Sequence, residues 1–176
     1  MSIRHLVATL VSLALSAGIA HAQQPSTAPP PFPALEGFAF WPSAQVKALV
    51  DKLAAANERG VATAVERFGD SGSFKVFVER RAPGDFAPEA HVFIDDLLYV
   101  QDGEARLLYG GAIEGGQDRG NGEIRGGRIV DGKSQTIAAG DLFFLPAGMP
   151  HQIMVAPGKH VYILAIKATN AKAAAK

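Results

Sequence analysis

The stretch that decides the fold runs Gly140-Asp-Leu-Phe-Phe-Leu-Pro146-Ala-Gly148-Met-Pro-His151 and has the pattern G-x5-P-x-G-x2-H. An apolar run ends in Pro-Ala-Gly-Met-Pro, and a histidine follows at once. Proline and glycine in this order indicate a tight turn between two strands. Such a turn would aim His151, from the start of one strand, back towards the face of the strand before it.

Histidine is scarce outside this motif. The chain has five histidines, and two of them, His5 and His21, lie in an N-terminal segment that we expect to be removed. His91 lies in a stretch rich in carboxylates, Glu89-Ala-His-Val-Phe-Ile-Asp-Asp96. Imidazole and carboxylate groups are the ligands of many divalent metal sites. The sequence therefore indicates a metal site.

The spacing of these residues decides which side chains can meet. Residues two apart on a strand point to the same face, so Glu89 and His91 can enter one cavity. Asp96 is five residues beyond His91, an odd offset that a single straight strand would not allow. A bend across residues 92–95 would let Asp96 begin the next strand and face inward. Asp95 is the competing choice for the same role.

Strand signals dominate from Phe74 onward. Short segments rich in aromatic and β-branched residues alternate with Asp-Gly, Gly-Gly and Pro-Gly turns, a pattern that indicates an all-β antiparallel barrel or sandwich. Strands do not alternate with helices here, which argues against a doubly wound α/β fold. A turn is expected at Asp102-Gly103. The expected strands are residues 74–80, 96–101, 104–109, 142–145, 151–155 and 160–167.

The first 22 residues have the features of a secretory signal peptide. Basic Arg4 and His5 precede an apolar run over residues 6–19, and Ala-His-Ala at 20–22 is a cleavage site. This predicts a periplasmic or secreted protein whose mature chain begins at Gln23 and has no membrane span. Residues 23–42 are rich in proline near their start and are expected to form a flexible leader.

An amphipathic helix is expected over residues 43–60, with Ser43 as its N-cap. It would cover the outside of a barrel that spans residues 70–167, and a flexible tail would follow at 168–176. Apolar residues recur at the helical spacing of three and four positions. They are Val46, Leu49, Val50, Leu53 and Ala54.

Composition excludes several classes of function. Basic and acidic residues number 17 each, so the formal net charge is zero and nothing attracts nucleic acid. The absence of cysteine excludes thiolate zinc sites, iron–sulfur clusters and cysteine nucleophiles. Apolar residues make up 48% of the chain, which is enough for a packed core without disulfides.

One long glycine-rich stretch, residues 115–127, supports two hypotheses. It is either a mobile solvated loop or a lid over the mouth of the barrel, because long loops in compact domains are often functional. Gly120-x-Gly122 is not a dinucleotide-binding fingerprint, since no βαβ unit surrounds it. Lys75, Arg80 and Arg81 are expected to form a solvated face.

These motifs resemble those of the cupin superfamily, whose members are small β-barrels of the jelly-roll kind. The second cupin motif, G-x5-P-x-G-x2-H-x3-N, matches from Gly140 through His151, with Val155 in place of the final Asn. The resemblance covers residues 74–167. It implies an all-β, cupin-type antiparallel β-barrel, with the N-terminal α-helix packed outside.

The first cupin motif, G-x5-H-x-H-x3–4-E-x6-G, is present in a variant form. Gly84 is one residue away from the opening glycine. The remaining positions are Glu89 for the first histidine, His91 for the second, Asp96 for the glutamate, and Gly103 for the closing glycine. The run Gly122-Glu-Ile-Arg-Gly126 and the variant Glu-x-His-x4-Asp also resemble a subgroup of exported single-domain cupins.

The resemblance implies a ligand set and a range of chemistries. Carried over by position, the metal ligands are Glu89, His91, Asp96 and His151, which suit Fe, Mn, Zn or Ni. Dioxygenase, isomerase, decarboxylase and lyase activities occur in the family, and Glu89 or Asp96 could accept a proton. The alternatives are a non-catalytic cupin that binds a small molecule or a metal, and a structural protein acting through barrel–barrel homodimers. An acid at a ligand position can also mark a barrel that has lost its metal.

Overall fold

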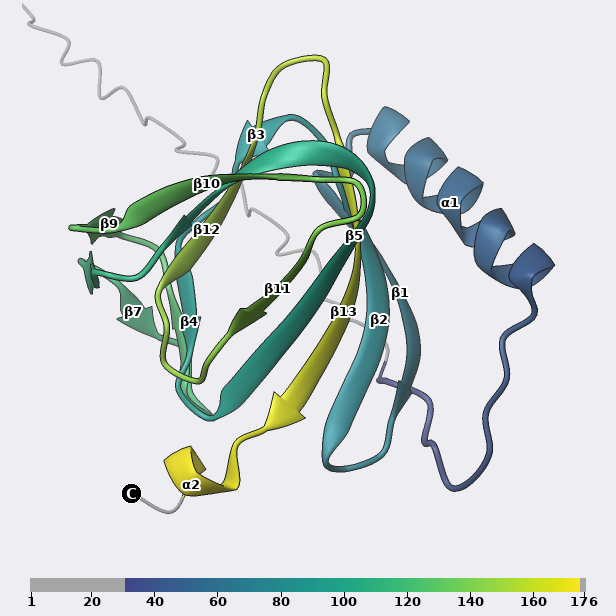
Figure 1. Ribbon diagram of the computed structural model, residues 1–176, viewed down its shortest axis with the longest axis horizontal. Helices are drawn as coiled ribbons and strands as arrows, with labels where there is room; N and C mark the ends of the chain where they lie inside the picture. Colours follow the sequence, from purple (N-terminus) through teal and green to yellow (C-terminus); the bar gives the residue numbers. More distant parts are fainter. Residues whose placement is uncertain (1–30, 175–176) are drawn as a thin grey trace, which may run out of the picture. The chain divides into compact units, whose positions relative to one another are not determined.

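The computed structural model describes residues 31–174 (Figure 1). The predicted signal peptide, and the predicted leader up to residue 30, lie outside the described residues. Neither helix within residues 31–174 is long and apolar enough to cross a membrane. The elements, in chain order, are α1 (Ser43–Glu58), β1 (Thr63–Asp70), β2 (Phe74–Arg81), β3 (Gly84–Asp85), β4 (Glu89–His91), β5 (Ile94–Tyr109), β6 (Ala112–Glu114), β7 (Gln117–Asp118), β8 (Glu123–Arg125), β9 (Arg128–Val130), β10 (Lys133–Ala138), β11 (Leu142–Leu145), β12 (His151–Val155), β13 (Val161–Thr169) and α2 (Ala171–Ala174).

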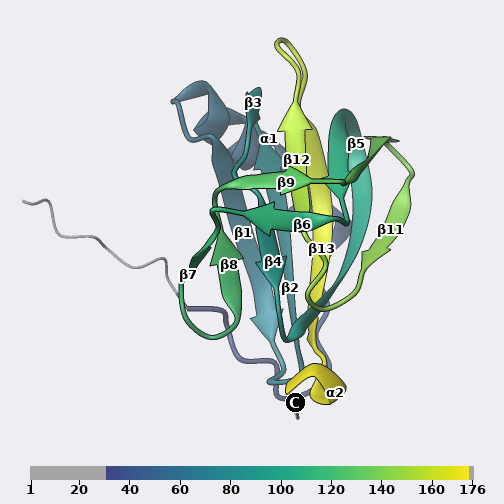
Figure 2. The ribbon, with the colours of Figure 1, turned by 90° about the vertical axis from the view of Figure 1, so that its left-hand side faces the viewer.

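Strand β5 joins two antiparallel layers into a barrel (Figures 1 and 2). Its first half pairs with β13 and β11, and β13 pairs in turn with β2, which pairs with β1. Its second half pairs with β10 and β12, and β12 continues to β3 and β4. Strand β4 pairs with β8, and β8 with β7. The prediction of an all-β antiparallel barrel with one N-terminal helix outside it is confirmed.

Strand β5 passes from one layer to the other through a β-bulge. Val100 and Asp102 pair with consecutive residues of β13, so Gln101 is the extra residue. Gly103 follows at φ 78°, and a Cβ there would overlap the carbonyl oxygen of His160. The predicted turn at Asp102-Gly103 is therefore wrong. The Asp-Gly pair bends a continuous strand, because glycine can adopt this backbone conformation without a clash.

An apolar core fills part of the barrel interior, because alternate residues on its strands point inward and many of these are apolar. Along β5, Leu98 and Val100 are buried, whereas Leu97 and Tyr99 are exposed. The buried core includes Phe77, Val100, Leu107, Ile153, Val155 and Ile163.

Helix α1 packs on the outer face of β1 and β2 (Figure 1). Leu53 is buried on this helix and packs with Val78 of β2 and Tyr162 of β13. The helix ends at Glu58, two residues before the predicted boundary, at the turn that contains Gly60. Its N-cap position is Pro42, without a side-chain cap, and Ser43 is the first helical residue.

The chain departs from the expected boundaries in three places. Strand β1 belongs to the sheet although it begins at Thr63, before the expected start of the barrel at residue 70. Its sequence alone did not indicate a strand. At the other end, β13 continues to Thr169 and α2 follows, with the Asn170 side chain bonded to Asp95. The glycine-rich stretch 115–127 contains β7 and β8, and β8 pairs with β4.

Candidate metal centre

Two adjacent strands bring Glu89, His91 and His151 together inside the barrel. Glu89 and His91 are the ends of β4, and His151 begins β12, where it pairs with Glu89. One nitrogen or oxygen from each side chain lies within 4.8 Å of the others. The residues are 7%, 7% and 4% exposed respectively. The expectation that Glu89 and His91 share a face with His151 is met.

The Pro-Gly turn fixes the position of His151. Gly148 has φ 80°, and its N–H donates to the carbonyl oxygen of His91 at 2.8 Å. The Gly110 N–H donates to the Pro150 carbonyl at 2.9 Å. The turn is thus bonded to the end of β4 and to the residue after β5, so His151 starts its strand beside the other two residues.

Asp96 faces the cluster and Asp95 does not. Asp96 is 2% exposed, and its Oδ2 lies 3.5 Å from His91 Nε2 and 3.9 Å from His151 Nε2. Asp95 points the other way and accepts bonds from the Ala147 N–H at 2.7 Å and the Asn170 amide at 3.0 Å. The turn between β4 and β5 resolves the odd offset as expected. Asp96 nevertheless lies outside the tight group of three.

Hydrogen bonds fix the orientation of both imidazole rings. His91 Nδ1 lies 2.5 Å from Glu123 Oε2, and His151 Nδ1 lies 3.0 Å from the Met149 carbonyl oxygen. A carbonyl oxygen or a carboxylate only accepts, so each Nδ1 carries the proton. Each Nε2 points towards the centre of the cluster. A partner on the far nitrogen is typical of histidines that bind metal.

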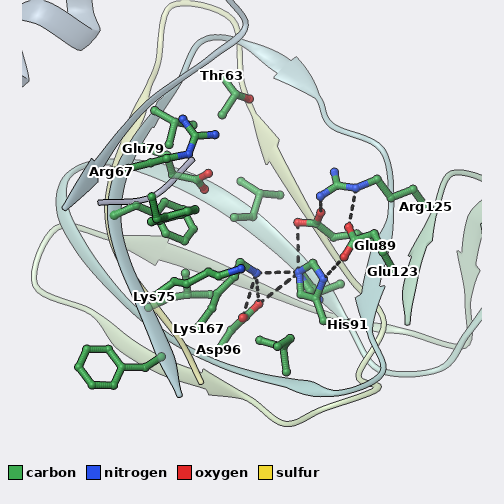
Figure 3. A pocket seen from close by; sticks show the side chains of 18 of the residues that line it. Thr63, Arg67, Lys75, Glu79, Glu89, His91, Asp96, Glu123, Arg125 and Lys167 are labelled. Carbon is green, nitrogen blue, oxygen red and sulfur yellow. Dashed lines mark hydrogen bonds and ion pairs between the residues drawn. The ribbon is translucent and has the colours of Figure 1, made fainter. Parts of the chain in front are cut away.

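Two arginines, Arg125 and Arg81, lie near Glu89, and Figure 3 shows Arg125 beside it. Arg125 lies 2.6 Å from Glu89 Oε2 and also 2.6 Å from Glu123 Oε1. Arg81 bonds Glu79 at 2.9 Å and lies 3.8 Å from Glu89. The Arg81 side chain is 12% exposed, so the predicted solvated face is wrong for this residue. Its direction on β2 turns it into the barrel.

These charges determine the ionisation of the carboxylates. Burial raises the pKa of Glu89, but the hydrogen bond and charge of His151, with Arg125 and Arg81, outweigh burial and hold the pKa well below its ordinary value. Burial also raises the pKa of Glu123, and His91 and Arg125 lower it further than burial raises it. Both side chains are therefore carboxylates at neutral pH.

Lys167 of β13 supplies a third cation. Its Nζ lies 2.7 Å from His91 Nε2, and 2.9 and 2.8 Å from the two oxygens of Asp96. An ammonium group only donates, which confirms that His91 Nε2 is an acceptor. Figure 3 shows dashed lines from the end of Lys167 to both Asp96 and His91.

Sequence reasoning missed four residues of this cluster: Arg81, Glu123, Arg125 and Lys167. Lys167 is the last expected strand residue, and its distance along the chain from the motifs hid its role. Glu123 and Arg125 are two apart, like Glu89 and His91. This spacing would place both side chains on one face of a strand, and it was the one signal in the glycine-rich stretch that could have identified them.

The cluster lines a cavity of about 790 Å³. Arg67 and Lys75 lie on the opposite side of this cavity from Glu89 and Arg125 (Figure 3). Its apolar lining includes Phe32, Phe74, Phe77 and Phe86. A small molecule with both polar and apolar parts fits this kind of lining.

The donor set fits a divalent cation. With Nδ1 protonated, His151 Nε2 lies 3.3 Å from the Glu89 oxygen, and this contact is favourable when Nε2 carries a second proton or when a metal cation lies between the two atoms. A metal cation could therefore take the place of that proton. Imidazole nitrogen and carboxylate oxygen suit first-row divalent metals.

No family model matches the chain, and no curated protein matches it. Solved structures similar to it include a double-stranded β-helix protein from Klebsiella pneumoniae, with 18% identity over 64% of this chain and 81% of that one and a TM-score of 0.47. A polyketide cyclase from Streptomyces resistomycificus has 18% identity over 61% of this chain and 66% of that one, with a TM-score of 0.45. The Cnp3 cupin domain of Schizosaccharomyces pombe has 12% identity over 61% of each chain and a TM-score of 0.46. Such likenesses concern the fold alone. The two antiparallel layers shared by β5, with the motif residues meeting inside them, give the described part of the chain a cupin-type barrel fold.

Proposed function

We propose that this protein binds a divalent metal ion through Glu89, His91, Asp96 and His151, and acts on a small polar molecule in the cavity. The observation that carries the proposal is the close approach of His151 Nε2 to Glu89 Oε1, at 3.3 Å inside the barrel. A bound metal cation would replace the proton that this contact otherwise needs, and would contact both atoms. Fe, Mn, Zn and Ni all accept these ligands.

A bound divalent ion would supply Lewis acidity at this position. The protein contributes the fixed ligands, the charges of Arg81 and Arg125, and a cavity lining that contains both charged and aromatic side chains. Glu89 and Asp96 are the candidate proton acceptors, since both are buried and face the cavity. Export to the periplasm or the medium, through residues 1–22, is part of the proposal.

Elemental analysis by mass spectrometry tests the metal site. The protein is to be produced in the periplasm and compared with Glu89→Ala and His151→Ala. His160→Ala is the matched control, because His160 lies outside the cluster and pairs with Asp102. We expect near-stoichiometric metal in the wild type and the control, and loss of metal in the other two variants.

Two outcomes would contradict the proposal. One is wild-type protein that holds no metal and takes up none when Zn²⁺, Mn²⁺, Ni²⁺ or Fe²⁺ is supplied. The other is metal that remains in His151→Ala. Circular dichroism of each variant would show whether the barrel is still folded, so loss of metal is not confused with unfolding.

A second candidate function is non-catalytic binding of a small molecule. The described side chains favour it in one respect, since three cations, of which Arg125 is half exposed, already face the carboxylates of the cluster. These three cations form ion pairs with four carboxylates. The cations are Arg81, Arg125 and Lys167, and the carboxylates are Glu79, Glu89, Asp96 and Glu123. Only one negative charge is left over when both histidines are neutral, so the barrel can fold without metal. A protein that binds ligand in the presence of a chelator would support this function.

A further inference from the structure

We propose that Lys167 is an internal competitor for the metal: its ammonium group holds His91 and Asp96 in the metal-free protein and must leave before a metal can use all four ligands. This inference rests on the proposed function. In this role, Lys167 controls how tightly the site binds metal.

The competition follows from the geometry at His91. An imidazole Nε2 has one lone pair in the plane of the ring. Nδ1 keeps its proton and donates a hydrogen bond to Glu123, so the lone pair of Nε2 is free to accept a hydrogen bond from Lys167 Nζ at 2.7 Å. The same lone pair is the one that a metal would need. Lys167 and a metal therefore exclude each other at His91.

Asp96 is also bonded to Lys167. Both of its oxygens accept bonds from Lys167, at 2.9 and 2.8 Å. Asp96 is 2% exposed, so without Lys167 or another cation its charge would be buried without compensation. Each oxygen keeps a second lone pair, so at Asp96 the ammonium opposes a metal through its positive charge rather than by occupying the ligand atom.

Lys167 has room to leave. Its side chain is 24% exposed and lines the cavity of about 790 Å³. A lysine stem is flexible, so its ammonium can move into this space while the β13 backbone stays paired. Glu89 and His151 make no bond to Lys167, so a metal can contact these two residues first. Complete binding would then release the ammonium.

Calorimetric titration with Zn²⁺ tests the inference on wild type, Lys167→Met and Lys75→Met. The Lys75 variant is a close control, because Lys75 pairs with Lys167 across the strands and lines the same cavity, but contacts none of the four proposed ligands. We expect Lys167→Met to bind Zn²⁺ at least about tenfold more tightly than wild type, since bonds between charged partners no longer oppose binding. Lys75→Met should bind like wild type.

Chemical labelling of lysines, read by mass spectrometry, follows the displacement directly. In wild-type protein, Zn²⁺ should increase the labelling of Lys167 and leave that of Lys75 unchanged. Thermal unfolding of the metal-free Lys167→Met protein adds a second check. Its melting temperature should be lower than that of wild type and should recover when Zn²⁺ is added.

The outcomes separate this inference from the proposed function. Zn²⁺ binding that depends on His151 but is equal in wild type and Lys167→Met would leave the proposed function standing and overturn the inference. Unchanged labelling of Lys167 on Zn²⁺ binding would overturn it as well. Binding to Lys167→Met alone would support the competition and show that wild-type protein carries no resident metal. Absence of binding to both proteins would overturn both proposals.

Discussion

Asp95 and Asp96 are neighbours in the chain with opposite environments. Asp96 faces the imidazoles and Lys167, whereas Asp95 bonds to the Ala147 N–H of the Pro-Gly turn and to the Asn170 amide. The alternation of side chains along β5 separates them. One carboxylate thus contributes to the candidate metal site, while its neighbour holds the turn that precedes His151.

At the residue scale, the pair of Asp102 and His160 predicts a dependence of stability on pH. The hydrogen bond from His160 is the main cause that holds the pKa of Asp102 below its ordinary value, with smaller contributions from the Gly103 N–H and nearby charges, while slight burial opposes them. Because the pKa is lower in the folded protein, the stabilisation is complete above the ordinary pKa of about 3.9 and is lost as the pH falls through the folded value.

We therefore expect Asp102→Asn to lower the free energy of unfolding at pH 6 by about 0.5 kcal/mol, because the pair is largely exposed. Urea titrations at pH 6 and pH 3 would measure the effect, and the difference from wild type should shrink at pH 3. Asp51→Asn on helix α1 serves as the control. A difference that grows in acid would contradict the assignment.

The residues that could be predicted from sequence are those with a local signal. Glu89, His91 and His151 were identified because they lie in compact motifs, and Asp96 because a bend was assumed before it. Arg81 and Lys167 could not be identified in this way. Their direction depends on which face of β2 and β13 turns inward, and pairing between distant strands decides that.

At the element scale, the glycine-rich stretch 115–127 contributes to the site instead of only connecting strands. Strand β8 pairs with β4 and carries Glu123 to His91 and Arg125 to Glu89. Glycine content predicted a loop because glycine weakens strands. The segment Glu123–Arg125 between the glycines has only three residues, which is too short for a strand pattern to be recognised in the sequence. Hydrogen bonds to β4 hold this segment as a strand, although its own sequence has little strand preference.

The bulge in β5 lets us predict how a substitution at Gly103 changes the stability of the protein. Replacement by alanine would combine an unfavourable positive φ with a clash against the His160 carbonyl. We expect Gly103→Ala to lower the free energy of unfolding by about 2–4 kcal/mol, as measured by urea denaturation. Gly140→Ala is the control, because Gly140 also has positive φ (95°) but a Cβ added there would meet no other atom within 4 Å. It should cost only about 1 kcal/mol. Equal losses would show that the clash at Gly103 is relieved.

Alternation and turn signals predicted the strands, but they did not predict how β5 continues. The sequence Asp102-Gly103 is typical of a hairpin turn. In this protein the partners of β5 change at that point from β13 and β11 to β10 and β12, and these strands lie later in the chain. Pairing with distant segments therefore overrides the local turn signal. Strand β1 was missed for a similar reason, since its pairing with β2 gives it a place in the barrel.

At the scale of the whole molecule, the order of strands differs from the order of the chain. Strand β13, the last in sequence, lies between β2 and β5 (Figures 1 and 2). Strands β10, β11 and β12 also pair with β5. Each half of the chain, before and after the glycine-rich stretch, is thus incomplete without the other. Lys167 reaches Asp96 and His91 because of this interleaving.

The interleaving implies that the protein should survive a cut in its backbone. A protease site placed at residues 119–121, in the exposed turn between β7 and β8, would divide the chain after β7. We expect the two pieces to separate on a denaturing gel but to elute as one species in native size-exclusion chromatography, because β13 stays inserted between β2 and β5. Separation of the pieces under native conditions would contradict this. The same property would let two separately expressed fragments assemble into the barrel. If each fragment were fused to one of two interacting proteins, folding of the barrel would report that the two proteins had met.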